Sequence, residues 1–127
     1  MVPMNRVVTG IDMVDIPRLD GVLGRHGGRF LRRVFTENEL SEAGNRTTSL
    51  AARFAAKEAV AKALGTGIGR VGWRDIEVLR DLEGQPNLHL YGAAAQIASD
   101  LSISTWSVSL THTQNTAAAI VVGISLE

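Results

Sequence analysis

The chain has 127 residues, of which 45% are hydrophobic and 20% are charged, and its formal net charge is zero. This length suits one domain with a substantial core, so residues 1–127 are predicted to form a single domain. The absence of cysteine excludes disulfides and cysteine-based zinc or thiolate chemistry. Zero net charge argues against general nucleic-acid binding. The sequence shows neither a signal peptide nor an apolar run of membrane-spanning length, so we expect a cytoplasmic protein.

The first predicted element is a strand over residues 6–14, a segment rich in β-branched residues. Asp12 is unusual within it, because aspartate is depleted in strands. Either the strand ends at this residue or a ligand holds its carboxylate. Asp15 and Pro17 then indicate the start of a short helix, with Asp15 as the N-cap and the proline in the first turn.

Basic residues gather in the segment that follows. Between Arg18 and Arg33 the sequence has five arginines and only Asp20 to oppose them. Such a cluster is most often a solvated helix face, but it also suits docking of an acidic partner, where charge sets encounter rate and specificity. Glycines interrupt the helical pattern here, and it resumes over residues 29–35 with the predicted core residues Phe30, Leu31, Val34 and Phe35.

A second short helix is predicted by the capping box that Thr36 and Glu39 form. This helix should end near Gly44, and residues 45–48 should form a polar loop.

Residues 49–65 are predicted to form a long helix, because the segment is dominated by alanine and leucine. Ser49 or a neighbouring threonine is placed to cap its start, and Gly65 suits a left-handed residue just beyond its end.

The charges inside this helix fall into two groups at helical spacing. Arg53 and Lys57 share one edge, and Glu58 and Lys62 share another edge that also carries apolar and small residues. A carboxylate in an apolar stripe needs a partner, because an unpaired buried charge is costly. Lys62 could supply that partner as an ordinary structural pair one turn away from Glu58.

A glycine-rich run, residues 65–70, follows the long helix. Familiar phosphate-binding loops follow a strand and open a helix, whereas these glycines close one. They form either a helix stop and a turn, or a loop whose backbone N–H groups approach a ligand closely. The pattern alone does not separate these two interpretations.

The rest of the chain predicts a hairpin, a helix and a second hairpin. The expected strands cover residues 73–81, 87–91, 105–111 and 117–126, and the expected helix covers residues 92–101. The last strand is almost wholly apolar and is predicted to be central and buried. His112 ends its neighbouring strand, a position where a lone histidine is more often a surface residue than a ligand or a base. The fold class is therefore predicted to be α+β, with a mostly antiparallel sheet packed on the long helix and several short helices.

Several motifs occur together in an order and spacing that resemble one family. From about Val7 to Val122 the chain resembles holo-[acyl-carrier-protein] synthase, the small bacterial type of 4′-phosphopantetheinyl transferase. The motifs that carry this resemblance are Gly10-Ile-Asp12 with Arg18, Arg53-Phe-Ala-Ala-Lys-Glu58 with Lys62, Gly65-Thr-Gly67-Ile-Gly69, and Ser109-Leu-Thr-His112. The resemblance places the two unusual carboxylates, Asp12 and Glu58, in a single site.

The resemblance implies the fold of that family and transfer of phosphopantetheine from coenzyme A to a serine of apo-acyl carrier protein, which releases adenosine 3′,5′-bisphosphate. It implies that Asp12 and Glu58 hold Mg²⁺, an ion that prefers oxygen ligands. Lys62 would lie on the pyrophosphate of the coenzyme, which makes Asp12, Glu58 and Lys62 the expected catalytic residues. The serine proton would pass either to Glu58 or to a metal-bound water.

The resemblance also implies the binding partners and the assembly. The resemblance makes the carrier protein the acidic partner, and the excess of arginine in the basic cluster leads us to expect that Arg18 and Arg25 dock it. A homotrimer with sites between subunits is implied by the resemblance, and no nucleic-acid or membrane partner is expected. The acceptor could belong to fatty acid or to polyketide synthesis. The residues expected to bind coenzyme A are Arg53, Lys62, Gly65, Gly67, Thr111 and His112.

Two other functions fit parts of the pattern. A non-catalytic subunit that binds coenzyme A or a nucleotide would not need Asp12, Glu58 and Lys62, yet all three are present. A metal-dependent hydrolase of nucleotide pyrophosphates would share the metal ligands but would need no surface for a carrier protein.

Overall fold

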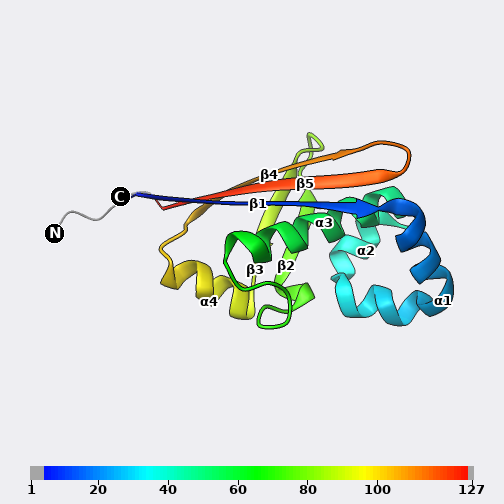
Figure 1. The fold of residues 1–127 in the computed structure, drawn as a ribbon, viewed down its shortest axis with the longest axis horizontal. Helices are drawn as coiled ribbons and strands as arrows, with labels where there is room; N and C mark the ends of the chain where they lie inside the picture. The colour runs from blue at the N-terminus through cyan, green and yellow to red at the C-terminus, as the bar shows by residue number, and fades with distance from the viewer. Residues whose placement is uncertain (1–4, 126–127) are drawn as a thin grey trace.

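The helices and strands follow one another in the order that the sequence predicts, except that the strand expected over residues 73–81 begins with a short 3₁₀ helix (Figure 1). The structure is a computed structural model that describes residues 5–125. The α+β prediction is confirmed, and Leu126, at the end of the last predicted strand, lies outside the described residues. The elements are β1 (Arg6–Asp15), α1 (Ile16–Val34), α2 (Glu37–Ala43), α3 (Thr47–Ala63), the 3₁₀ helix η1 (Trp73–Asp75), β2 (Ile76–Arg80), β3 (Pro86–Leu90), α4 (Gly92–Asp100), β4 (Thr105–His112) and β5 (Thr116–Ser125).

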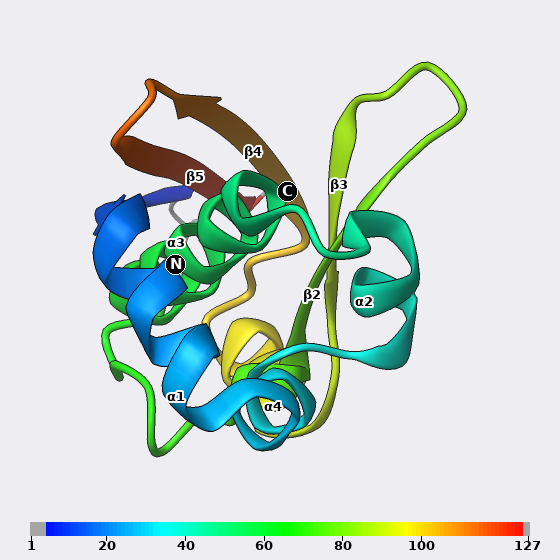
Figure 2. The same cartoon turned by 90° about the vertical axis from the view of Figure 1, so that its right-hand side faces the viewer.

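Two antiparallel sheets form the β layer. The larger has the strand order β1-β5-β4, and the smaller pairs β2 with β3. The central position predicted for the last strand is confirmed, since Ala117, Ala119 and Val121 of β5 are buried. In Figure 1, α3 runs along one face of the larger sheet, with α1 and α2 gathered at one end of the molecule and α4 at the other, and Figure 2 shows the same arrangement turned by 90°.

The helix α3 lies at the centre and is buried on most of its circumference. It begins at Thr47, two residues before the predicted start, and its N-cap position is Arg46 without a side-chain capping bond. The predicted cap by Ser49 or a threonine is therefore wrong. Its end is as predicted, because Gly65 has a φ of 78° and its N–H donates to the Lys62 carbonyl at 3.0 Å.

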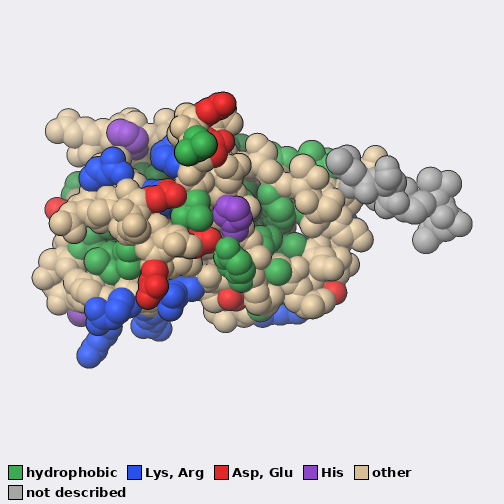
Figure 3. All heavy atoms as spheres, turned by 180° about the vertical axis from the view of Figure 1, so that it is seen from behind, with side chains coloured by type: hydrophobic (Ala, Val, Ile, Leu, Met, Phe, Trp, Pro, Cys, Tyr) green, Lys and Arg blue, Asp and Glu red, His purple; other side chains and the backbone are tan. Residues whose placement is uncertain are grey.

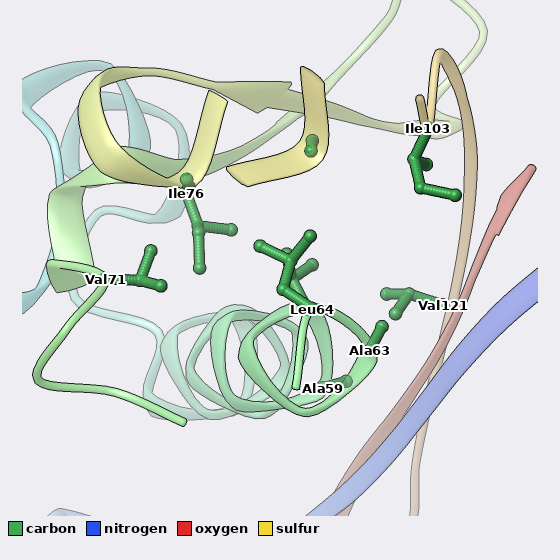
Figure 4. Close-up of a cluster of buried hydrophobic side chains, with 10 residues drawn as sticks. Ala59, Ala63, Leu64, Val71, Ile76, Ile103 and Val121 are labelled. Atoms are coloured by element: carbon green, nitrogen blue, oxygen red, sulfur yellow. The ribbon is translucent and has the colours of Figure 1, made fainter. Parts of the chain in front are cut away.

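The core packs around α3 on both sides. Figure 4 shows Ala59, Ala63 and Leu64 of this helix end meeting Ile76 and other apolar side chains from the surrounding elements. Small residues on α3 let neighbouring backbone come close. Gly10 of β1 is the extreme case, since a Cβ added to it would lie only 1.8 Å from the Ala59 carbonyl oxygen.

Two ion pairs join α3 to α2, and one of them is fully buried. Lys57 Nζ lies 2.7 Å from Glu39 Oε1, with both side chains fully buried, and Arg53 Nη2 lies 2.6 Å from Glu42 Oε1. Burial lowers the pKa of Lys57, and the neighbouring Glu39 carboxylate opposes that shift. The edge of the helix that carries Arg53 and Lys57 is thus an interior edge.

The segments before α3 follow the sequence pattern with one difference. The interruption predicted at the glycines is confirmed at Gly27, whose φ of 40° is not helical and which divides α1 into two helical parts across a kink. Asp15 occupies the predicted N-cap position, but its side chain makes no capping bond. The capping box of Thr36 and Glu39 is confirmed, and α2 ends at Ala43, just before Gly44. None of the helices within residues 5–125 is both long enough and apolar enough to cross a membrane.

Candidate active site

The two carboxylates singled out in the sequence line one cleft of about 560 Å³. Asp12 comes from β1 and Glu58 from α3, and the close approach of these elements at Gly10 brings the two together. Glu58 is half-buried. Its pKa is raised, first by burial and then by the negative charge of Asp12, while Lys62 opposes the shift. The rest of the cleft is mostly apolar and is lined by Met13, Val14, Asp15, Arg18, Leu19, Val22, Phe30 and Phe54.

Lys62 contacts this site through Asp12. Its Nζ lies 3.0 Å from Asp12 Oδ1 and donates to the Ile11 carbonyl, also at 3.0 Å. The Lys62 side chain is 52% exposed and that of Asp12 is 19% exposed. Within the described part of the chain, Lys62 forms its ion pair with Asp12, so the structural Glu58–Lys62 pair considered from the sequence is wrong.

Asp12 and Glu58 are the two carboxylates that the resemblance assigns to a metal ion, and Asp15 is a third carboxylate that lines the cleft. Among residues 5–125 no group of three or more His, Cys, Asp or Glu side chains is arranged to hold a metal. Asp12 and Glu58 still fit a hard cation such as Mg²⁺, because Mg²⁺ is often bound by one or two carboxylates, with waters and phosphate oxygens as its remaining ligands.

Thr111 and His112 line a separate pocket of about 310 Å³. His112 is exposed, as the sequence predicts for a histidine at a strand end. The pocket also contains Arg46 and Arg80, two basic residues that the sequence analysis did not select, together with Thr48, Ser49, Ala52 and Leu110. Arg46 precedes α3, and its Nη2 donates to the Glu42 carbonyl at 2.9 Å. Hydroxyl groups, two guanidinium groups and an imidazole together suit an anionic ligand.

Arg53 does not line this pocket, contrary to its expected contact with the coenzyme. Its side chain is 2% exposed. Its guanidinium forms the ion pair with Glu42, and Nε donates to the Val78 carbonyl at 3.0 Å. It also donates to the Ser49 hydroxyl, which does line the pocket. Arg53 therefore supports the pocket wall from behind.

The glycine run after α3 forms the helix stop. Gly67 has a φ of 68°, and its N–H donates to the Ala61 carbonyl at 3.2 Å, while the N–H of Gly65 donates to Lys62. The backbone N–H groups of Gly65 and Gly67 that were expected to close on a nucleotide are therefore engaged with the helix.

The two pockets lie on opposite edges of the larger sheet. Asp12 is on β1 and the Thr111–His112 pair is on β4, with β5 between these strands. Arg18 lines the Asp12–Glu58 cleft, and Arg25 is exposed farther along α1. Figure 3 shows basic side chains gathered along the edge of the molecule beside α1.

Comparison with known proteins identifies one family. The model of the 4′-phosphopantetheinyl transferase superfamily matches residues 9–121. A holo-[acyl-carrier-protein] synthase of Herpetosiphon aurantiacus is 49% identical, over 93% of this chain and 98% of the relative. Another, from Gloeobacter violaceus, is 47% identical over 88% of each chain.

Solved structures give the same result. The holo-[acyl-carrier-protein] synthase of Helicobacter pylori in complex with coenzyme A superposes with a TM-score of 0.83 at 31% identity, covering 91% of this chain and 98% of that one. The enzyme of Neisseria meningitidis also gives a TM-score of 0.83, at 37% identity, covering 91% and 96% of the two chains. The chain belongs to the holo-[acyl-carrier-protein] synthase family of the 4′-phosphopantetheinyl transferase superfamily.

Proposed function

We propose that the protein transfers 4′-phosphopantetheine from coenzyme A to a serine of apo-acyl carrier protein in a reaction that depends on Mg²⁺. The observation that carries this proposal is the meeting of Asp12 and Glu58 in one cleft, with the Lys62 ammonium 3.0 Å from Asp12 Oδ1. The family membership and the coenzyme A complex of the Helicobacter pylori relative support it. The serine oxygen bonds to the phosphorus next to the pantetheine, and the bond from that phosphorus to the bridging pyrophosphate oxygen breaks. Adenosine 3′,5′-bisphosphate then leaves.

Asp12, Glu58 and Lys62 would have different roles in this transfer. Asp12 and Glu58 would hold Mg²⁺, which supplies charge neutralisation for the pyrophosphate when it is bound. Lys62 adds a compact positive charge on a flexible stem that can follow the phosphates. The raised pKa of Glu58 also suits this carboxylate to accept the serine proton.

A homotrimer is proposed as the working form. The face of the larger sheet that points away from α3 exposes apolar side chains, with Val7 64%, Ile11 61%, Met13 68% and Ile120 45% exposed. Covering such a face with further copies of the chain would remove apolar surface from water. It would also let the Thr111–His112 pocket of one copy approach the Asp12–Glu58 cleft of the next, so that both could hold one coenzyme between subunits.

The remaining proposed contacts are with the coenzyme and the carrier. Arg46, Arg80 and His112 would hold phosphate groups of coenzyme A in their pocket, with Thr111 beside them. Arg18 and Arg25 would dock an acidic surface of the carrier protein near the cleft. The cytoplasm stays the predicted location.

Mass spectrometry of a carrier protein tests the proposal. Purified apo-acyl carrier protein is incubated with coenzyme A, Mg²⁺ and the enzyme, and the expected result is the mass gain of one phosphopantetheine group. Omission of Mg²⁺ and the variant Asp12→Asn should each abolish the gain. A protein that binds coenzyme A without modifying the carrier would instead be a binding subunit. Cleavage of coenzyme A without any gain on the carrier would identify a pyrophosphate hydrolase.

A further inference from the structure

The Lys62 ammonium forms an ion pair with Asp12, one of the two carboxylates that the proposed function assigns to the metal ion. It lies 3.0 Å from Asp12 Oδ1 and 3.0 Å from the Ile11 carbonyl oxygen, both on β1. This contact crosses from α3 to β1, although Glu58 stands only one helical turn away from Lys62. The ammonium is therefore held by the strand, at one of the two carboxylates that the proposed function assigns to the metal ion.

The charges of the cleft explain why an ammonium is held there. Asp12 and Glu58 are close enough for the charge of Asp12 to oppose ionisation of Glu58, while Lys62 favours it. Arg18 also lines the cleft, but within residues 5–125 it forms no ion pair with either carboxylate. Lys62 is thus the cation that offsets the repulsion between the two acids.

A divalent cation and an ammonium bind a carboxylate through the same oxygen lone pairs, and their positive charges repel each other. We infer that Lys62 is the internal counter-ion of Asp12 and leaves Asp12 when a divalent cation binds there, so that cation binding releases the ammonium toward the coenzyme. This inference rests on the proposed function, because it takes Asp12 as a metal ligand.

The exposure of Lys62 makes this exchange inexpensive. Its side chain is 52% exposed and carries a flexible four-carbon stem, so it can leave Asp12 without opening the core. Lys57 shows the opposite arrangement, since its ammonium is fully buried between Glu39 and the Trp73 carbonyl. One lysine of α3 is fixed and the other is free to move.

The exchange sets an order of binding. Before the cation binds, Lys62 is committed to Asp12 and is a poor partner for a phosphate. After the cation binds, the ammonium and the metal can neutralise different oxygens of the pyrophosphate. Coenzyme A should therefore bind more tightly to the protein that already holds the cation, through a contribution that Lys62→Met removes.

Calorimetric titration with Mg²⁺ alone, in the absence of coenzyme A, tests the competition. Removing an exposed ion-pair competitor should tighten Mg²⁺ binding about three- to fivefold in Lys62→Met. The matched control is Arg18→Met, which removes a positive charge that lines the same cleft without a bond to Asp12. This control should change the affinity by about twofold or less, because solvent screens the Arg18 charge and because Arg18 forms no ion pair with either carboxylate within residues 5–125.

A second measurement follows Lys62 directly. The chain has only two lysines, Lys57 and Lys62, so selective ¹⁵N-lysine labelling gives two side-chain ammonium resonances that Lys62→Met assigns. Saturating Mg²⁺ should move the Lys62 resonance to the position it has in Asp12→Asn, where its partner charge is gone, and should leave Lys57 unchanged.

Each outcome of the two measurements bears on the inference. If Mg²⁺ binds but Lys62→Met gains no more affinity than Arg18→Met, or if the Lys62 resonance stays in place at saturation, the exchange is refuted while the metal site stands. If Mg²⁺ binds to none of these proteins, the metal assignment of the proposed function is refuted as well.

Discussion

Replacing Gly10 by alanine tests whether the spacing between β1 and α3 sets the geometry of the site. The added Cβ would lie 1.8 Å from the Ala59 carbonyl oxygen. Nonbonded heavy atoms need roughly 3.5 Å, so β1 must shift away from α3 by about 1.7 Å. Asp12 and Ile11 would move with the strand, away from Glu58 and Lys62. The backbone of both elements is involved, so no rotation of a side chain can relieve the clash.

The expected cost is larger for activity than for stability. Overpacking of this kind costs about 1–3 kcal/mol of stability, which a domain of this size can tolerate. Misplacement of reacting groups by about 1 Å can cost about 100-fold in rate. We therefore expect Gly10→Ala to lower kcat about 100-fold at a temperature well below its Tm, measured by transfer to apo-acyl carrier protein.

A matched glycine separates the local clash from a general effect of alanine. Gly24 lies in α1, and nothing lies within 4 Å of a Cβ added to it. Gly24→Ala should keep the wild-type rate and a wild-type or slightly higher Tm, because alanine favours helix. Wild-type turnover by Gly10→Ala would refute the reasoning, since it would mean that the site tolerates a displaced strand.

Four further variants test other parts of the structure. Glu58→Gln removes a carboxyl group whose pKa in the folded protein is raised above its ordinary value of 4.5. Because the folded state favours the protonated form of Glu58, the wild type should lose stability relative to this variant as the pH rises through the Glu58 pKa of the folded state. Thermal melts of both proteins at acidic and at neutral pH measure this change, and a stability difference that does not vary with pH would contradict it. Arg18→Ala should raise KM for the carrier protein but not for coenzyme A, and added salt should mimic the change in steady-state assays. Equal salt dependence in the variant and the wild type would count against docking at Arg18. His112→Ala should weaken coenzyme A binding about tenfold by calorimetry, which is the scale expected for the loss of one charge-assisted hydrogen bond. Its Mg²⁺ affinity should stay unchanged, and an unaltered affinity for coenzyme A would show that His112 is not part of the binding site. Lys57→Met leaves the Glu39 carboxylate buried and unpaired, so it should cost about 3–5 kcal/mol in denaturant unfolding, whereas Lys57→Met combined with Glu39→Leu should cost much less.

The sequence contained enough information for the element order and for the two carboxylates. Asp12 was detectable because aspartate is rare within a strand, and Glu58 because it lies among small apolar residues. These are local properties, which a single segment reveals. The resemblance then joined the two into one site, and the structure places both in the same cleft.

The partner of Lys62 was not predictable in this way. The helical spacing favours Glu58, four residues earlier, and the observed partner Asp12 is 50 residues away in the chain. The choice depends on how β1 crosses α3, which Gly10 sets through a tertiary contact that has no local pattern. The convergence of Arg46 and Arg80 in one pocket was missed for the same reason.

The burial of Arg53 and Lys57 was missed for a different reason. Reasoning about helical faces assumes one buried stripe and one solvated side. The helix α3 is covered by the larger sheet, by β2 and by α2, so even its charged edge lies inside. Only pairing with Glu39 and Glu42 makes that burial tolerable, and these acids come from another helix.

The neighbours Lys57 and Glu58 show how one helix serves both structure and chemistry. Successive side chains on a helix point about 100° apart, so the two residues leave α3 in different directions. The Lys57 side chain lies on the buried side of α3, where its ammonium donates to Glu39 and to the Trp73 carbonyl. Glu58 enters the cleft beside Asp12, where its pKa is raised. A helix fixed from behind by a buried ion pair can hold a carboxylate close to another negative charge without moving away from it, because a shift of α3 would break the buried pair. The repulsion between the Asp12 and Glu58 carboxylates therefore persists in the cleft, where a bound cation can offset it.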